Sequence, residues 1–145
     1  MSIALYVAIG GALGSLARYA VGLALRALSP ESVFPWATLF VNVLGCLAIG
    51  AVHEFGVVRG GLSESLRGFI VIGILGGFTT FSAFGLESVL LSRDGNARLA
   101  NINILAQVVL GLAAVIAGAW LVRVSLRARA RLDPSGGAHD VRVAR

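Results

Sequence analysis

The stretch that decides the fold is residues 73–87, Gly-Ile-Leu-Gly-Gly-Phe-Thr-Thr-Phe-Ser-Ala-Phe-Gly-Leu-Glu. It lies inside an apolar run, residues 66–91, that is long enough to cross a bilayer, which needs about 20 residues. Its two adjacent glycines and two adjacent threonines fall close to the midpoint of the run, and both kinds of residue are poor helix formers. The sequence therefore predicts a membrane-spanning helix with a central break.

A helix break at membrane depth frees backbone carbonyls that lipid cannot satisfy. One interpretation is that a small cation, held by main-chain oxygens, satisfies them. The other is a kinked but continuous helix, in which the hydroxyls of Thr79 and Thr80 bond back to carbonyls. The residues alone leave both interpretations open.

Three further apolar runs of spanning length surround this segment, at residues 3–28, 34–55 and about 102–122. Hydrophobic residues make up 57% of the 145-residue chain and charged residues 13%, about half the usual quarter. These values exclude a soluble globular domain and a disordered chain. The expected fold class is an all-α membrane protein, with a four-helix transmembrane domain at 1–123 and a disordered Arg-rich tail at 124–145.

The net charge of +5 comes from twelve arginines and no lysine. Because the arginines lie at the ends of the apolar runs and in the tail, they predict membrane topology and no nucleic-acid partner. Four spans place both termini on one side, and the arginines near the membrane ends are balanced: Arg59, Arg67 and Arg123 on that side against Arg26, Arg93 and Arg98 on the other. This balance is typical of a chain that inserts in both orientations, whereas the tail arginines favour cytoplasmic termini.

Small residues recur every three or four positions in two of the runs. Gly10, Gly14, Arg18 and Gly22 form such a stripe in the first run, and residues 111, 114 and 118 form one in the fourth. Stripes of this kind let helix backbones approach closely, so they predict packing surfaces.

Polar and aromatic residues inside the runs are the candidate site. Phe81 and Phe84 share a helix face and can present positive ring edges to an anion, or simply pack. Asn42 offers amide donors, and Asn103 and Gln107 extend the set by one turn of the fourth run; interhelical hydrogen bonding is the alternative use. No catalytic constellation accompanies them, so an enzyme is not expected.

Two charges, Arg18 and Glu87, lie inside the first and third runs. Charged side chains at membrane depth are costly unless they pair or face water. They can pair with each other or line an aqueous vestibule in which Arg18 concentrates anions. A structural role or snorkelling to the interface is the other interpretation of each.

The chain resembles the Fluc (CrcB) family of small prokaryotic fluoride channels over about residues 5–120. The resemblance rests on three stretches in order: GGALGSLARY at 10–19, TLFVNVLG at 38–45, and GGFTTFSAF at 76–84 followed by Glu87. Where many members have a tyrosine near the start of the fourth span, this chain has Asn103.

The resemblance implies a passive fluoride channel in the prokaryotic plasma membrane, built as an antiparallel, dual-topology dimer with two pores and one central Na⁺. It also implies a role for each matching residue. The carbonyls of Gly76 and Thr79 hold the Na⁺. The pore is lined by Asn42, Thr80, Phe81, Ser82 and Phe84. Asn103, at the position where many members have tyrosine, and Gln107, one turn later, complete the pore lining.

Two other functions remain as alternatives. A small multidrug-type proton-coupled exporter also has about four spans, but such exporters resemble one another in a first-span glutamate that this chain lacks. A non-transporting membrane assembly subunit would use the glycine stripes and leave the Thr-Thr-Phe-Ser segment unexplained. The partner can be a second copy of the chain or an oppositely oriented paralogue.

Overall fold

A computed structural model describes residues 2–58 and 60–132. In chain order the helices are α1 (Ile3–Leu28), α2 (Trp36–Val58), α3 (Glu64–Arg67), the π-helix η1 (Gly68–Leu75), α4 (Gly76–Phe78), α5 (Phe81–Arg93) and α6 (Ala97–Leu132). Four segments are long and apolar enough to cross a membrane: Ile3–Leu28, Trp36–Val58, Glu64–Arg93 and Ala97–Ala128. The predicted all-α fold with four spanning segments is confirmed.

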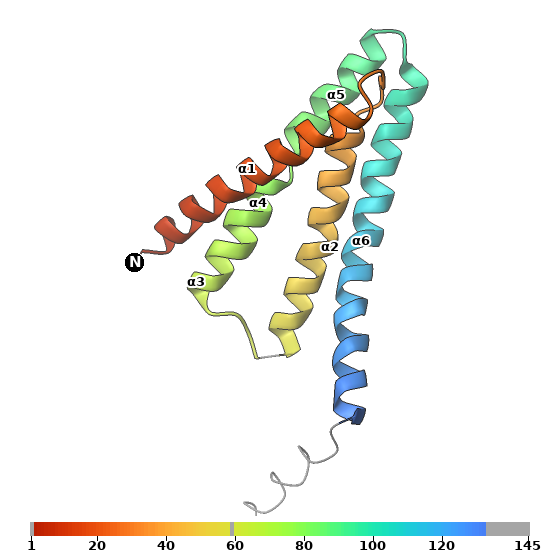
Figure 1. Ribbon diagram of the computed structural model, residues 1–145. Coiled ribbons are helices and arrows are strands. Elements are labelled where there is room, and N and C mark those ends of the chain that lie inside the picture. Colours follow the sequence, from red (N-terminus) through yellow and green to blue (C-terminus); the bar gives the residue numbers. More distant parts are fainter. Residues whose placement is uncertain (1, 59, 133–145) are drawn as a thin grey trace, which may run out of the picture.

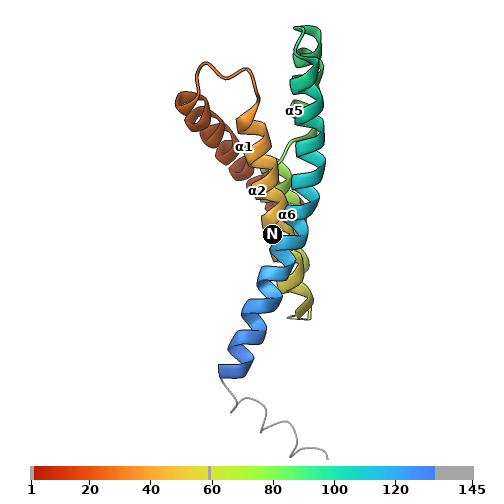
Figure 2. The same ribbon diagram turned by 90° about the vertical axis from the view of Figure 1, so that its right-hand side faces the viewer.

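The helices form an open arrangement (Figure 1). α2 and α6 run side by side in the same direction, while α3, η1, α4 and α5 ascend in the opposite direction as one interrupted segment. α1 crosses η1 and α4 obliquely, and its upper end stands away from α5 (Figure 2). α1 therefore packs against the first half of the third segment, at η1 and α4, whereas the second half, α5, packs against α6.

Glycines set the close contacts between helices. Gly10 and Gly14 are buried, and a Cβ at either position would run into the backbone of η1, at Phe69 and Ile74 respectively. Gly118 lies equally close to α2: a Cβ there would come within 3.0 Å of the Ala51 nitrogen. The two predicted stripes are thus packing surfaces at these positions.

An ion pair joins the lower ends of α2 and α6. The Arg123 Nε and Nη2 atoms donate to the two carboxylate oxygens of Glu54, at 2.7 and 2.9 Å. Glu54 is buried, so this two-point contact supplies the partner that a buried carboxylate requires. The pairing was not predicted from the sequence, where Arg123 was counted only toward topology.

The predicted start of the tail is wrong. α6 continues to Leu132 in place of ending near Val122, so residues 124–132 are helical. A helix already stabilised by the apolar span and the Glu54 contact extends through the arginines and alanines that follow, which are good helix formers. Residues 133–145, the rest of the predicted tail, lie outside the described residues.

The stripe on α1 offers a matched pair of substitutions. Gly14→Ala should lower stability by about 1–3 kcal/mol, because its Cβ would lie within 2.9 Å of the Phe78 nitrogen in a packed backbone contact. Gly22→Ala, with no atom within 4 Å, should raise it by about 0.5–1 kcal/mol through helix propensity. Thermal unfolding of the purified variants in detergent measures both changes; equal effects would contradict the packing role of Gly14.

Candidate functional site

The third spanning segment is interrupted at two threonines. α4 ends at Phe78 and α5 begins at Phe81, and between them Thr79 (φ −81°, ψ 158°) and Thr80 (φ −152°, ψ 115°) have extended backbone. The Thr80 hydroxyl caps α5 by accepting from the Ala83 N–H at 3.2 Å. The chain therefore leaves helical geometry for two residues inside a spanning segment.

Asn42 on α2 satisfies the backbone of this interruption. Its Oδ1 accepts from the Thr80 N–H at 2.8 Å, and its Nδ2 donates to the Thr80 carbonyl at 3.0 Å. Nδ2 also donates to Gln107 Oε1 on α6, at 3.0 Å. One amide thus connects three helices and supplies the partners that the Thr80 N–H and carbonyl require at this depth.

These bonds fix which way the Gln107 amide faces. A backbone N–H can only donate, so Asn42 must turn its oxygen to Thr80 and its nitrogen to Gln107. Gln107 must then present its oxygen to Asn42, because two NH₂ groups would repel. Its Nε2 is left buried and without a partner among the described residues. The site therefore holds an amide donor that no acceptor within residues 2–58 and 60–132 uses.

Gln107 lines a cavity together with two aromatic residues. This cavity of about 330 Å³ is lined by Asn42, Thr79, Thr80, Phe81, Phe84 and Gln107, together with Gly76 and apolar residues of α2, η1 and α6. The ring centroids of Phe81 and Phe84 are 5.3 Å apart, with the rings inclined at 70°, an edge-to-face pair. Amide N–H groups and ring edges both carry partial positive charge, so the cavity suits a small anion.

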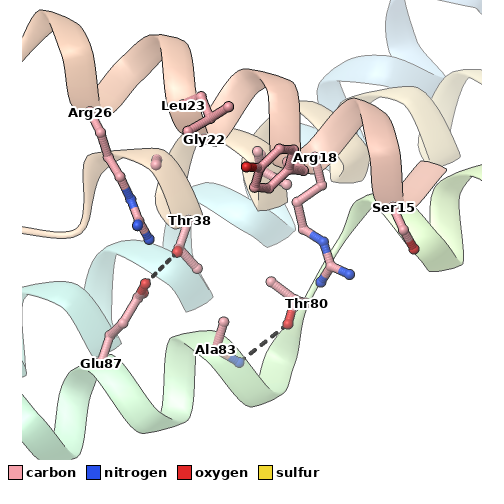
Figure 3. A pocket seen from close by; sticks show the side chains of 12 residues that line it. Ser15, Arg18, Gly22, Leu23, Arg26, Thr38, Thr80, Ala83 and Glu87 are labelled. Carbon is pink, nitrogen blue, oxygen red and sulfur yellow. Dashed lines mark hydrogen bonds between the residues drawn. The ribbon is translucent and has the colours of Figure 1, made fainter. Parts of the chain in front are cut away.

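A second cavity, of about 370 Å³, lies between α1 and the α2–α5 pair (Figure 3). Arg18 and Arg26 line it from α1, and in Figure 3 Arg18 extends toward Thr80. Glu87 accepts a hydrogen bond from the Thr38 hydroxyl at 2.8 Å, and its other oxygen is buried without a partner among the described residues. Arg18 and Glu87 share this cavity but form no ion pair within the described part of the chain.

Thr80 lines both cavities. The arginine-lined cavity and the phenylalanine-lined cavity therefore adjoin at the interruption of the third segment. Thr80 is thus shared by a cavity lined by charged residues and a cavity lined by neutral polar and aromatic residues.

Two predicted pore residues lie elsewhere. Ser82 is exposed, and its Oγ is 3.3 Å from Thr80 Oγ1. Asn103 is completely buried, donates to Ser88 Oγ at 2.9 Å and lines neither cavity. The structure brings Asn42, Thr80, Phe81, Phe84 and Gln107 together, and these two residues flank them.

Three residues that line a cavity or bond a predicted site residue were not predicted from the sequence. Arg26 lies eight residues after Arg18 on α1, Thr38 lies four before Asn42 on α2, and Ser88 lies four after Phe84 on α5. Each spacing is one or two helical turns, which places the missed residue on the same helix face as a predicted one. That spacing was the available signal.

The family model "CrcB-like protein, Camphor Resistance (CrcB)" matches residues 5–119. The chain belongs to the CrcB family. A relative from Nitrobacter hamburgensis, named fluoride-specific ion channel FluC 1, is 46% identical over 121 residues, covering 83% of this chain and 94% of the relative. A FluC protein from Rhizobium etli is 49% identical (83% and 95% covered), and one from Paracoccus denitrificans is 50% identical (79% and 89% covered).

Substitution of Asn42 tests its hold on the interruption in this CrcB-family chain. Asn42→Leu should speed hydrogen exchange of the Thr80 amide about tenfold or more, because losing a buried partner is worth about 1–3 kcal/mol. Asn42→Asp keeps an acceptor for that N–H and should leave the amide protected. Hydrogen exchange followed by mass spectrometry or NMR measures the difference; equal protection in both variants would contradict the assigned contact.

Proposed function

We propose that this chain is a fluoride channel, a multi-pass protein of the bacterial plasma membrane through which fluoride leaves the cytosol passively. The observation that carries the proposal is the buried Gln107 amide, whose Nε2 donor is unused among the described residues, on a residue that lines one cavity together with Phe81 and Phe84. The names of the relatives, fluoride-specific ion channels at 46–50% identity, point to the same ion.

One cavity attracts the anion and the other solvates it on its way through the membrane. Fluoride is small and strongly hydrated, so a pore must replace its water with close donors. Arg18 and Arg26 raise the local concentration of anions in the first cavity, and Thr80 leads into the second. There the Gln107 amide and the ring edges solvate the ion without a fixed cation, which would hold it too tightly to release it.

Exit through such a pore needs no coupled energy source. Neutral hydrogen fluoride crosses membranes, ionises in the less acidic cytosol and is trapped there as the anion. Because the membrane potential is negative inside, it drives fluoride outward. A selective passive channel is therefore sufficient for fluoride resistance.

Fluoride efflux from liposomes containing the purified protein, read with a fluoride electrode, tests the function. Gln107→Leu should lower flux about tenfold or more, since a hydrogen bond to a charged group is worth about 1.5–3 kcal/mol. Phe81→Ile and Phe84→Ile remove the positive ring edges and should also lower flux. Asn101→Leu, at an exposed position of α6 that lines neither cavity, should leave flux unchanged. Efflux that requires an imposed proton gradient would favour an exporter, and no efflux a non-transporting subunit.

We further propose that the chain works as an antiparallel homodimer. Thr80 and Ala83 direct their N–H groups to side chains, to Asn42 Oδ1 and Thr80 Oγ1. In a continuous helix those N–H groups would serve the carbonyls of Gly76 and Thr79. Gly76 is exposed on one face of the third segment, so a second subunit is expected to cover it, and the balanced arginines favour opposite insertion over pairing with a paralogue.

The same two carbonyls fit the proposed Na⁺. Hard cations prefer oxygen ligands, and the Gly76 and Thr79 carbonyls are those whose helical donors are used elsewhere. When bound, the cation would neutralise carbonyl dipoles where two subunits meet. Because the cation ligands are main-chain carbonyls, a side-chain substitution should affect cation binding only where it redirects a backbone N–H.

Thr80 therefore provides a test of the cation and the dimer together. Thr80→Val keeps the side-chain shape but frees the Ala83 N–H to bond the Thr79 carbonyl, whereas Thr80→Ser keeps the hydroxyl cap. Dimers of the wild type and of Thr80→Ser should persist at higher dilution in sodium than in choline chloride, and Thr80→Val should lose that difference. Single-molecule counting of subunits in liposomes measures it; a dimer fraction insensitive to sodium in all three would refute the cation.

A further inference from the structure

We propose that Asn103 is a positioning residue that holds Phe84 in place through Ser88 and does not itself contact the permeating ion. The inference rests on the proposed fluoride function and refines one part of it. It assigns a role to a fully buried polar residue that lines neither cavity.

A two-step chain of hydrogen bonds connects Asn103 to Phe84. Asn103 Nδ2 on α6 donates to Ser88 Oγ at 2.9 Å, and Ser88 Oγ donates to the Phe84 carbonyl at 2.8 Å. Asn103, Ser88 and Phe84 are 0%, 6% and 8% exposed. Hydrogen bonds this well shielded from water are costly to break, so the chain is a firm link between α6 and the turn of α5 that carries the ring.

The number of available protons fixes which atom donates and which accepts in these two hydrogen bonds. The Phe84 carbonyl can only accept, so Ser88 must give it the single hydroxyl proton. The Ser88 oxygen can then only accept, which requires the Asn103 amide to present its nitrogen. The amide is left with a buried acceptor, Oδ1, without a partner among the described residues. A free carbonyl oxygen repels an anion, so this arrangement opposes direct binding of fluoride by Asn103.

The turn that carries Phe84 needs such a link. Gly85 follows Phe84, and no atom lies within 4 Å of the place where its Cβ would be, so nothing packs against the turn there. Phe81, the other ring of the pair, is 83% exposed and gives Phe84 little support from its own side. The link to Asn103 therefore fixes the backbone from which the Phe84 ring projects.

The link also sets the spacing between ring and donor. Gln107, which supplies the free amide donor, lies four residues after Asn103 on the same helix. α6 thus holds Phe84 through Asn103 and carries the amide donor, Gln107, one turn later. A rigid helix transmits the position of one to the other, as preorganised sites require.

A double-mutant cycle tests the proposal on the full chain in liposomes. Asn103→Leu and Ser88→Ala should each lower fluoride flux about threefold or more, and the double variant should be no worse than the more impaired single one, because both break the same link. Asn101→Leu, the same change at an exposed position of α6, should have wild-type flux. Effects of Asn103→Leu that multiply with those of Ser88→Ala, or wild-type flux in both single variants, would overturn the proposal.

A second measurement separates this inference from the fluoride function. The ¹³C chemical shift of the Phe84 carbonyl, read by NMR, should change in Asn103→Leu although Asn103 does not touch that atom, and should be unchanged in Asn101→Leu. If the leucine variant does not fold, Asn103→Ser, whose hydroxyl is one bond shorter, replaces it. An unchanged shift refutes the link whatever the flux, whereas a changed shift with no wild-type fluoride flux refutes only the function.

Discussion

The pairing of the Asn42 amide with the backbone of Thr80 is the constraint on which the rest of the site depends. A spanning helix can leave helical geometry only where another group takes over its N–H and C=O, because lipid supplies neither donor nor acceptor. Asn42 takes over both at Thr80, with contacts of 2.8 and 3.0 Å. The two extended threonines are therefore a stable feature of the fold.

The features that suit an ion follow from that pairing. Since Asn42 must turn its nitrogen toward Gln107, the Gln107 donor faces away and stays unused. Since the N–H groups of Thr80 and Ala83 are engaged by side chains, the carbonyls of Gly76 and Thr79 lose their helical donors. The same cavity is thus lined by the residue that keeps a free donor, Gln107, and by the two residues whose carbonyls lose their helical donors.

α6 fixes the position of the Gln107 donor relative to α2 and α5. It lies beside α2, is held there by close contact at Gly118 and by the Glu54–Arg123 ion pair, and contacts α5 through Asn103. Three points of attachment along one helix leave little freedom for the donor at Gln107. An ion site that must discriminate by close donor contacts requires this kind of rigidity.

The sequence by itself determined the membrane class, the four spans and the weak point in the third, because length, apolar content and poor helix formers are local properties. It also identified six polar residues that line the two cavities, Arg18, Asn42, Thr79, Thr80, Glu87 and Gln107. It did not determine which polar groups meet: Glu54 with Arg123, Asn103 with Ser88, or Thr38 with Glu87 in place of Arg18. Those partners lie 69, 15 and 49 positions apart, and only the packing of the helices, fixed by backbone contacts at glycines, decides which faces are opposed.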